Sequence, residues 1–387
     1  MTDRLRTQHF DVIVVGAGAM GSAAAYQLAR RGRSVLALER FQIPHQMGSS
    51  HGLTRIIRLA FHEGPEYVPL GRRAYRLWRQ LESETGQSLL TITGSVHAGE
   101  PGSVGFEQTL AACRRQGVEH EVLTSAQLAA RYPGYRLPSG FKAVLQSQGG
   151  FLAPERCVQA HAEAARALGA AVHERERVLG WEAHPGFVRV STDRADYDAG
   201  SLVLTAGAWA SQIMPELAGL AVPSRQVVVW FETLTRSWFK PSRFPVFILT
   251  LDDVEYYGFP DFERAGFKIG KFDLASGPAD PDALDRNRRP DEEEELRDVA
   301  RRCFPEAAGR TLDASVCMFT NSPDGHFVIG ADPRWPQVVF AAGFSGHGFK
   351  FASAIGEILA DLATSGRTEH DIDLFDPARF GAIRPPA

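Results

Sequence analysis

The sequence lacks any hydrophobic run long enough to cross a membrane. A transmembrane helix needs about 18 consecutive apolar residues, and no stretch of the 387 residues approaches that length. The first nine residues, MTDRLRTQH, contain no apolar core of the kind found in signal peptides, and the last four, RPPA, match no targeting signal. We therefore expect a cytoplasmic protein with no membrane association.

Cysteine is also scarce, with single residues at positions 113, 157, 303 and 317. This wide spacing argues against a disulfide-rich scaffold, and no C-x-x-C pair indicates a zinc site, so we predict no bound metal. Three of the four are expected to be small buried hydrophobic residues. Cys317 is considered below.

Neither sign of charge is in large excess. The 42 Lys and Arg residues are nearly balanced by 46 Asp and Glu, and the basic residues form no run. This predicts that nucleic acid is not a partner. The length and the hydrophobic content of 44% are instead those of a globular protein with room for two domains.

A glycine-rich turn between two apolar strands dominates the N-terminal part of the sequence. Residues 11–15 predict a buried parallel strand that runs directly into GAGAMG at 16–21. Apolar residues at helical intervals follow, and a second strand at 34–38 ends on Glu39. Two strands, a helix and an acidic residue in this order are typical of a dinucleotide-binding unit.

Each glycine of the motif has a physical reason. Gly16 allows the tight turn, Gly18 lets the backbone approach a pyrophosphate, and Gly21 lets the helix pack closely on the strand. The helix N-terminus offers free N–H groups to the anion. Glu39 is placed to bind a ribose hydroxyl, which favours FAD or NAD over NADP. Arg40 is predicted to contact the cofactor beside it.

The alternation of elements predicts an α/β fold with two interleaved domains. Helices are expected at 66–84, 105–116, 125–131, 153–170, 291–303 and 349–363. Strands are expected at 89–96, 143–146, 201–205, 226–232, 246–251, 256–259, 266–272 and 338–342, and the segments 170–182 and 187–197 are expected to be rich in strand. A Rossmann-like cofactor domain would comprise 1–88, 150–220 and 320–387. A strand-rich α+β substrate domain would comprise 89–149 and 221–319. Residues 46–58 are expected to form a loop over the cofactor or a solvated connector.

The glycine motif alone does not decide between FAD and NAD. A second turn, with Gly343, Gly346 and Gly348, precedes the last predicted helix and exposes backbone N–H groups at its start. Such groups can stabilise the negative charge of a reduced flavin. A glycine turn that only packs against the sheet explains the same spacing equally well.

Several long and unusual stretches carry a resemblance to a known family. They are the glycine motif, GSSHGLTRIIR (48–58), EYVPL (66–70), YYGFP (256–260), FKIGK (267–271), SVCMFT (315–320) and AAGFSGHGFKFAS (341–353). Over nearly its whole length the sequence resembles the monomeric sarcosine oxidase and N-methyltryptophan oxidase family of FAD-dependent amine oxidases. The resemblance implies a monomer with a covalent FAD attached through a cysteine thioether, and Cys317 is at the matching position.

The resemblance also implies roles for residues of the site. Arg58 and Lys350 would hold the substrate carboxylate, and Lys268 would promote the reaction of reduced flavin with O₂. The remaining predicted site residues are Ser49, Gly346, Gly348 and Lys350 at the cofactor and Arg55, His51, Tyr257 and His347 around the reaction centre. Taken singly, each basic residue is equally well explained as a surface charge, and Cys317 as ordinary core.

Two positions depart from the sarcosine oxidase pattern, because Phe319 and Phe272 stand where a tyrosine and a histidine are expected. Glu263-Arg264-Ala265 also replaces small residues. Our hypothesis is an oxidase of N-methyl amino acids that uses O₂ and yields the amino acid, formaldehyde and H₂O₂. Oxidation of a bulkier or cyclic secondary amine (N-methyltryptophan, pipecolate, proline or a glycated amino acid) is an alternative. An NAD-dependent amino-acid dehydrogenase and a non-catalytic flavin-binding module are alternatives of other classes.

Overall fold

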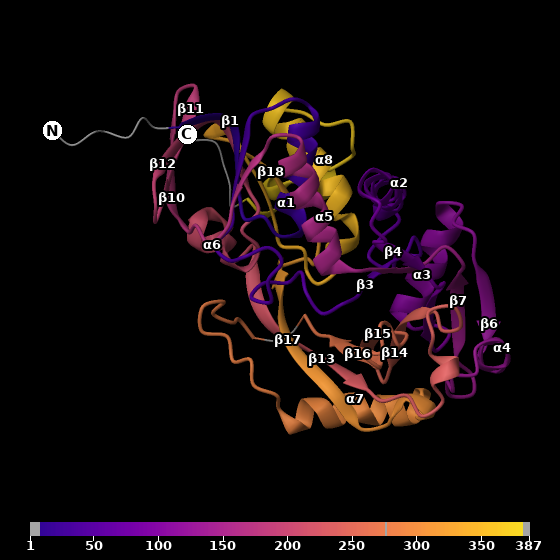
Figure 1. Cartoon of the computed structure of the whole chain (residues 1–387). Helices are drawn as coiled ribbons and strands as arrows, with labels where there is room; N and C mark the ends of the chain where they lie inside the picture. Colours follow the sequence, from indigo (N-terminus) through magenta and orange to yellow (C-terminus); the bar gives the residue numbers. More distant parts are fainter. Residues whose placement is uncertain (1–7, 275–276, 382–387) are drawn as a thin grey trace.

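The computed structural model describes residues 8–274 and 277–381. Most of the N-terminal segment and all of the RPPA end, which were used above to predict the absence of targeting signals, lie outside these ranges. Within them, no helix combines the length and the apolar character needed to cross a membrane. The mixed α/β class expected from the sequence is confirmed (Figure 1).

The first large sheet contains the strand that leads into the glycine motif. Its order is β10-β11-β12-β1-β2-β9, with β19 paired to β12 and β18 to β19. β1 is parallel to β2 and β12, as predicted for a dinucleotide-binding sheet. The strands of this sheet are β1 (Gln8–Val15), β2 (Val35–Leu38), β9 (Ala171–His173), β10 (Val178–His184), β11 (Phe187–Thr192), β12 (Asp196–Leu204), β18 (Val328–Asp332) and β19 (Trp335–Ala342).

The second large sheet lies below the first in Figure 1 and is mostly antiparallel. Its order is β17-β13-β16-β15-β14-β5-β7-β6, and β14 pairs with β5 in parallel. The strands of this sheet are β5 (Ser95–Gly99), β6 (Glu121–Thr124), β7 (Lys142–Gln146), β13 (Val222–Phe231), β14 (Val246–Leu251), β15 (Val254–Phe259), β16 (Phe267–Phe272) and β17 (Thr311–Asn321).

A small third sheet was not expected. It has the order β3-β8-β4 and contains β3 (Arg55–Ile57), β4 (Leu90–Ile92) and β8 (Gly150–Leu152). Part of the predicted loop at 46–58 is therefore a strand, β3, and β8 pairs with it in the antiparallel direction. The pairing matters for the site because Arg58 follows directly after β3.

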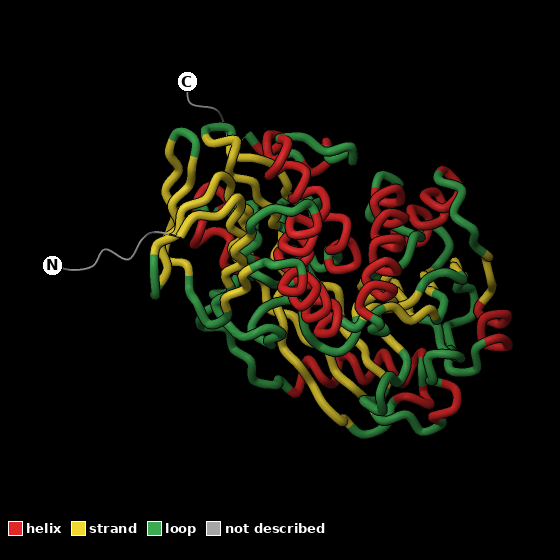
Figure 2. Tube along the Cα trace, turned by 45° about the horizontal axis from the view of Figure 1, so that its top comes forward, coloured by secondary structure: helices red, strands yellow, loops and turns green. Residues whose placement is uncertain are grey.

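Helices pack against both sheets, and in Figure 2 several of them run through the middle of the molecule with strands on either side. Val14 of β1 shares a core with Leu28 and Ile355 of two helices on the first sheet, and Phe267 of β16 shares another with Leu296 on the second. The helices are α1 (Ala19–Arg30), α2 (Tyr67–Thr85), α3 (Val104–Arg115), α4 (Ser125–Arg131), α5 (Pro154–Ala167), α6 (Ala210–Ile213), α7 (Pro290–Cys303) and α8 (Ala352–Ser365).

One strand prediction was wrong. The run at 89–96 is divided between β4 and β5, which belong to different sheets, because Gly94 between them takes a φ of +80°. Apolar residues stand at every second position on both sides of Gly94, so the pattern gave no sign of the break. The segment at 170–182, expected to be rich in strand, contains β9 and β10, with Arg175 at a φ of +56° between them.

The proposed division into domains remains a prediction. β17 runs continuously across the boundary placed at 319–320, although it pairs with β13 of the second sheet along its length.

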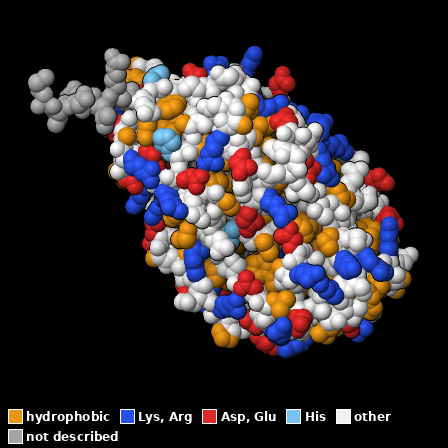
Figure 3. All heavy atoms as spheres, viewed as in Figure 1, with side chains coloured by type: hydrophobic (Ala, Val, Ile, Leu, Met, Phe, Trp, Pro, Cys, Tyr) orange, Lys and Arg blue, Asp and Glu red, His pale blue; other side chains and the backbone are white. Residues whose placement is uncertain are grey.

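On the face shown in Figure 3, acidic and basic side chains are interspersed and neither sign gathers into one patch.

Candidate functional site

Close packing at the glycine turn leaves no room for side chains at two of its three glycines. A Cβ on Gly21 would lie 1.8 Å from the carbonyl oxygen of Gly16, and one on Gly16 would lie 2.6 Å from the carbonyl oxygen of Thr205. Gly16 also takes a φ of +87°. A Cβ on Gly18 would meet only Ser50 Oγ, at 3.9 Å, so this glycine faces open space.

That open space belongs to a cavity of about 270 Å³ along the first sheet. The cavity begins beside Glu39, passes the glycine turn and reaches β17 and the second glycine turn. It brings together most of the predicted cofactor residues, which are Gly16, Gly18, Glu39, Arg40, Ser49, Cys317, Gly346 and Gly348, and it is also lined by Arg55. Gly21 is not part of the wall, because it is packed between Gly16 and Thr205.

Glu39 is buried at the far end of this cavity. Its carboxylate accepts hydrogen bonds from the backbone N–H of Ala17 at 3.0 Å and of Phe41 at 2.9 Å. Burial raises the pKa of Glu39, and these N–H groups oppose that rise. Arg40 next to it lies over the ring of Trp209 and pairs with Asp282 at 2.7 Å.

A second cavity of about 80 Å³ continues from the first. Residues that line both cavities are Arg55, Cys317, Phe319, Gly346 and Phe349. The second cavity alone is lined by four further predicted site residues: Arg58, Tyr257, His347 and Lys350. The two unusual phenylalanines, Phe272 and Phe319, lie on its wall with ring centroids 5.5 Å apart.

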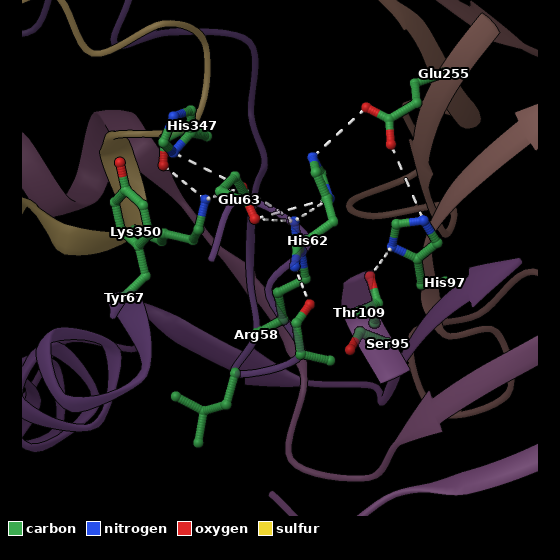
Figure 4. Close-up of polar contacts among 12 residues, drawn as sticks. Arg58, His62, Glu63, Tyr67, Ser95, His97, Thr109, Glu255, His347 and Lys350 are labelled. Atoms are coloured by element: carbon green, nitrogen blue, oxygen red, sulfur yellow. Dashed lines mark hydrogen bonds and ion pairs between the residues drawn. The ribbon is translucent and has the colours of Figure 1, made fainter. Parts of the chain in front are cut away.

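The two predicted carboxylate-binding cations meet at a buried acid, Glu63 (Figure 4). Arg58 Nη2 donates to Glu63 Oε2 at 2.9 Å, and Lys350 Nζ lies 3.6 Å from Glu63 Oε1. All three side chains are less than a tenth exposed. Arg58 follows β3, whereas Lys350 lies in the turn that leads into α8, so the fold joins them from distant parts of the chain.

Burial and the charge of Glu63 together set the pKa values of the groups in this cluster. Burial by itself would raise the pKa of the Glu63 carboxyl, but Arg58, His62 and Lys350 hold the pKa well below its usual value. Burial lowers the pKa of Lys350 to about 8, and Glu63 opposes a larger fall. Burial also lowers the pKa of His347 to about 3, so this imidazole is neutral.

Two other predicted residues, Lys268 and His51, lie behind the cavity walls. Lys268 Nζ donates to the carbonyl oxygens of Gly52 at 2.6 Å and Thr54 at 3.0 Å, and the Thr54 hydroxyl is 3.3 Å away. Burial, with Arg55 next, lowers the pKa of Lys268 well below its usual value. These three oxygen atoms can nevertheless accept hydrogen bonds from all three N–H groups of the charged form of Lys268. Burial likewise lowers the pKa of His51 to about 3.

Comparisons with known proteins agree with this geometry. Residues 11–362 match the model of a family described as FAD dependent oxidoreductase. The chain belongs to this family. It is 42% identical to the monomeric sarcosine oxidase of Bacillus sp. (strain NS-129), over 95% of this chain and 96% of that protein. It is 34% identical to N-methyl-L-tryptophan oxidase of Yersinia pestis (strain Pestoides F), over 96% and 99%.

Among solved structures, the chain is similar to NikD, an unusual amino acid oxidase essential for nikkomycin biosynthesis. The identity is 26% and the TM-score is 0.84, over 96% of this chain and 98% of that chain. The family membership selects FAD over NAD, which the glycine motif had left open.

The first cavity fits the FAD of this family. Gly18 offers the open approach that a pyrophosphate requires, and the N-terminus of α1 adjoins it. Glu39, Cys317 and the turn at 343–348 all line this cavity, as the predicted cofactor roles of these residues require.

Glu63 was missed by the sequence analysis. It lies five residues after Arg58, between two of the stretches that carry the family resemblance, but a single acidic residue in a loop gives no signal of its own. Only its closeness to Arg58 in the sequence could have suggested that the two side chains form an ion pair. Its proximity to Lys350 depends on the tertiary structure.

We predict that Glu63→Gln destabilises the protein. The change leaves Arg58 and Lys350 buried with no carboxylate between them, and breaking a buried ion pair from one side costs about 3–5 kcal/mol. Urea unfolding should show this loss in the free energy of unfolding. The matched control is Glu121→Gln, which removes an exposed pair with Arg131 and should cost less than about 1 kcal/mol. Equal losses in the two variants would contradict the role of Glu63.

Proposed function

We propose that the protein is an FAD-dependent oxidase of small N-methyl amino acids such as sarcosine. With O₂ it would yield the demethylated amino acid, formaldehyde and H₂O₂. The observation that carries the proposal is the pair of cations, Arg58 and Lys350, on the wall of a small cavity that opens onto the FAD cavity. Relatives named as sarcosine oxidases and N-methyltryptophan oxidases support the choice of an N-methyl amino acid.

The substrate carboxylate would bind to Arg58 and Lys350 in competition with Glu63. Arg58 offers two N–H groups in the planar arrangement that a carboxylate matches, and Lys350 adds a second positive charge. These cations also disfavour the protonated form of the substrate amine, so that the neutral amine needed for oxidation is present. Tyr257 and His347 would form the wall around the reacting carbon.

When bound, FAD supplies the two-electron oxidation of the amine carbon and passes the electrons to O₂. Lys268 and Arg55 are proposed to favour the second stage by placing positive charge near the developing superoxide. Lys268 would act from behind the loop at Gly52 and Thr54, which its ammonium group holds in place. His51 is buried beside the same loop and is proposed to support it.

The size of the second cavity favours a small substrate over the bulkier alternatives. Its volume of about 80 Å³ has room for about five to eight groups the size of a water molecule. Sarcosine fits in this space. The indole of N-methyltryptophan would require Phe272 or Phe319 to move. Phe272 and Phe319, the two departures from the sarcosine oxidase pattern, both lie on the wall of this cavity.

The first test is peroxide release from a panel of secondary amines. Sarcosine should be oxidised faster than N-methyltryptophan, pipecolate, proline and glycated amino acids. Arg58→Met should lower kcat/KM for sarcosine by roughly 10- to 100-fold, because hydrogen bonds to charged groups contribute about 1.5–3 kcal/mol.

An exposed arginine on β11 provides the control, and Arg189→Met should leave kcat/KM unchanged. Faster oxidation of a bulky or cyclic amine would select the alternative substrates. No peroxide from any amine in the panel would support a non-catalytic flavin-binding module.

Carboxylate binding should weaken as the pH rises through about 8, because Lys350 then loses its proton. Methoxyacetate is a suitable probe, since it has the shape of sarcosine but no amine to titrate. Its Kd can be measured from the perturbation of the flavin absorbance on either side of this pH. Lys350→Met should bind the probe weakly and without this pH dependence. A Kd for the parent protein that does not change with pH would contradict the assignment.

We further propose that FAD is attached covalently through Cys317. The thiol lies on β17 at the junction of the two cavities, where the flavin ring would end. Acid precipitation should leave the yellow colour with the polypeptide, whereas Cys317→Ser should release it into the supernatant. Cys157→Ala, which changes a buried cysteine in α5, should retain the colour. Release of the colour from the parent protein would exclude the thioether.

The monomeric state and the cytoplasmic location expected from the sequence remain predictions.

A further inference from the structure

Three buried polar atoms converge beside the start of α3. They are His97 Nε2, Glu255 Oε1 and Thr250 Oγ1, and none has a hydrogen-bond partner among the residues that the structure describes. A Cβ on Gly105 would lie 3.2 Å from His97 Nε2, 3.2 Å from Glu255 Oε1 and 3.4 Å from Thr250 Oγ1. All three atoms therefore border one small space, which the missing side chain of Gly105 leaves open.

A second histidine faces the same carboxylate (Figure 4). His62 Nε2 lies 3.6 Å from Glu255 Oε2, and His97 Nε2 lies 4.0 Å from Glu255 Oε1. One ligand atom from each of the three residues falls within 4.8 Å of the other two. No Lys or Arg within the described ranges pairs with Glu255, so the buried side of this carboxylate lacks a counter-charge.

Both imidazoles have partners on their other nitrogen. His97 Nδ1 lies 2.9 Å from the hydroxyl of Thr109. His62 Nδ1 accepts from Arg58 Nη2 at 3.1 Å and lies 3.7 Å from Glu63 Oε2. When Nε2 of His62 binds an ion, its proton is carried on Nδ1, and Glu63 is then the acceptor. A carboxylate behind a ligating histidine is a common arrangement in metal sites.

We infer that His62, His97 and Glu255 form a binding site for a divalent transition-metal ion of the Zn²⁺ type. Two imidazoles and one carboxylate are a ligand set that such ions prefer. Metal–ligand bonds of about 2.0–2.2 Å in a tetrahedron separate ligand atoms by roughly 3.3–3.5 Å. The observed separations of 3.6 and 4.0 Å reach different oxygens of Glu255, and the three ligand atoms lie within 4.8 Å of one another, so the side chains would have to move closer together when an ion binds. The hydroxyl of Thr250 or a water completes the coordination.

The site adjoins the substrate cavity, because His62 and Glu255 both lie on its wall. An ion on Nε2 would place the proton of His62 on Nδ1, which could then no longer accept from Arg58 and would instead donate to Glu63. The metal would therefore be coupled to the carboxylate-binding residues without contacting them. It supplies positive charge and rigidity, and the proposal requires no redox step from it.

The test is a calorimetric titration of the chelator-treated holoprotein with ZnCl₂. We expect one Zn²⁺ per chain, and we expect Glu255→Gln and His97→Gln each to weaken Kd by at least about tenfold. A titration with CoCl₂, followed at wavelengths beyond the flavin absorption, should show the intense bands of a four-coordinate ion in the parent protein but not in these two variants.

The matched control is His184→Gln, which removes an exposed histidine 3.7 Å from Glu182 and should leave Kd unchanged. Thermal melting and flavin absorbance confirm that each variant is folded. The inference is overturned if the parent protein shows no saturable binding, or if all four proteins bind Zn²⁺ equally. The space beside Gly105 would then hold a water only. Zn²⁺ binding is measured without turnover, so this outcome is independent of the proposed oxidase activity.

Discussion

The ion pair between Glu63 and its two cations is the interaction on which the candidate site depends. Arg58 and Lys350 are almost completely buried, where isolated charges are very costly. One carboxylate, that of Glu63, offsets both of them. Because Arg58 follows β3 and Lys350 leads into α8, the same contact also connects the small third sheet with the helical layer on the first sheet.

The position of the site follows from the meeting of two sheets. The first sheet provides the glycine turn, Glu39 and the second glycine turn, while β17 of the second sheet provides Cys317 and Phe319. Neither sheet alone encloses the cavities. A dinucleotide bound along the first sheet would therefore meet side chains of the second, where the smaller cavity lies.

The features predicted well from the sequence are those governed by neighbouring residues. The turn at 16–21 follows from steric limits on Gly16 and Gly21, and the parallel strands around it follow from their apolar runs. The predicted strand at 89–96 failed because Gly94 can either continue or end a strand. Cysteine spacing, which led us to predict no bound metal, carries no information about the cluster of His62, His97 and Glu255, whose members lie far apart in the chain.

By itself, the sequence determined the dinucleotide-binding unit, the α/β class and the family resemblance, because each depends on residue types at short, regular spacings. Only the tertiary structure decided that Glu63 lies between Arg58 and Lys350, that Phe272 and Phe319 narrow the second cavity, and that His62 and His97 share one carboxylate. Those contacts join segments separated by tens to hundreds of residues. Their distances are set by how the sheets pack, and no local pattern encodes that packing.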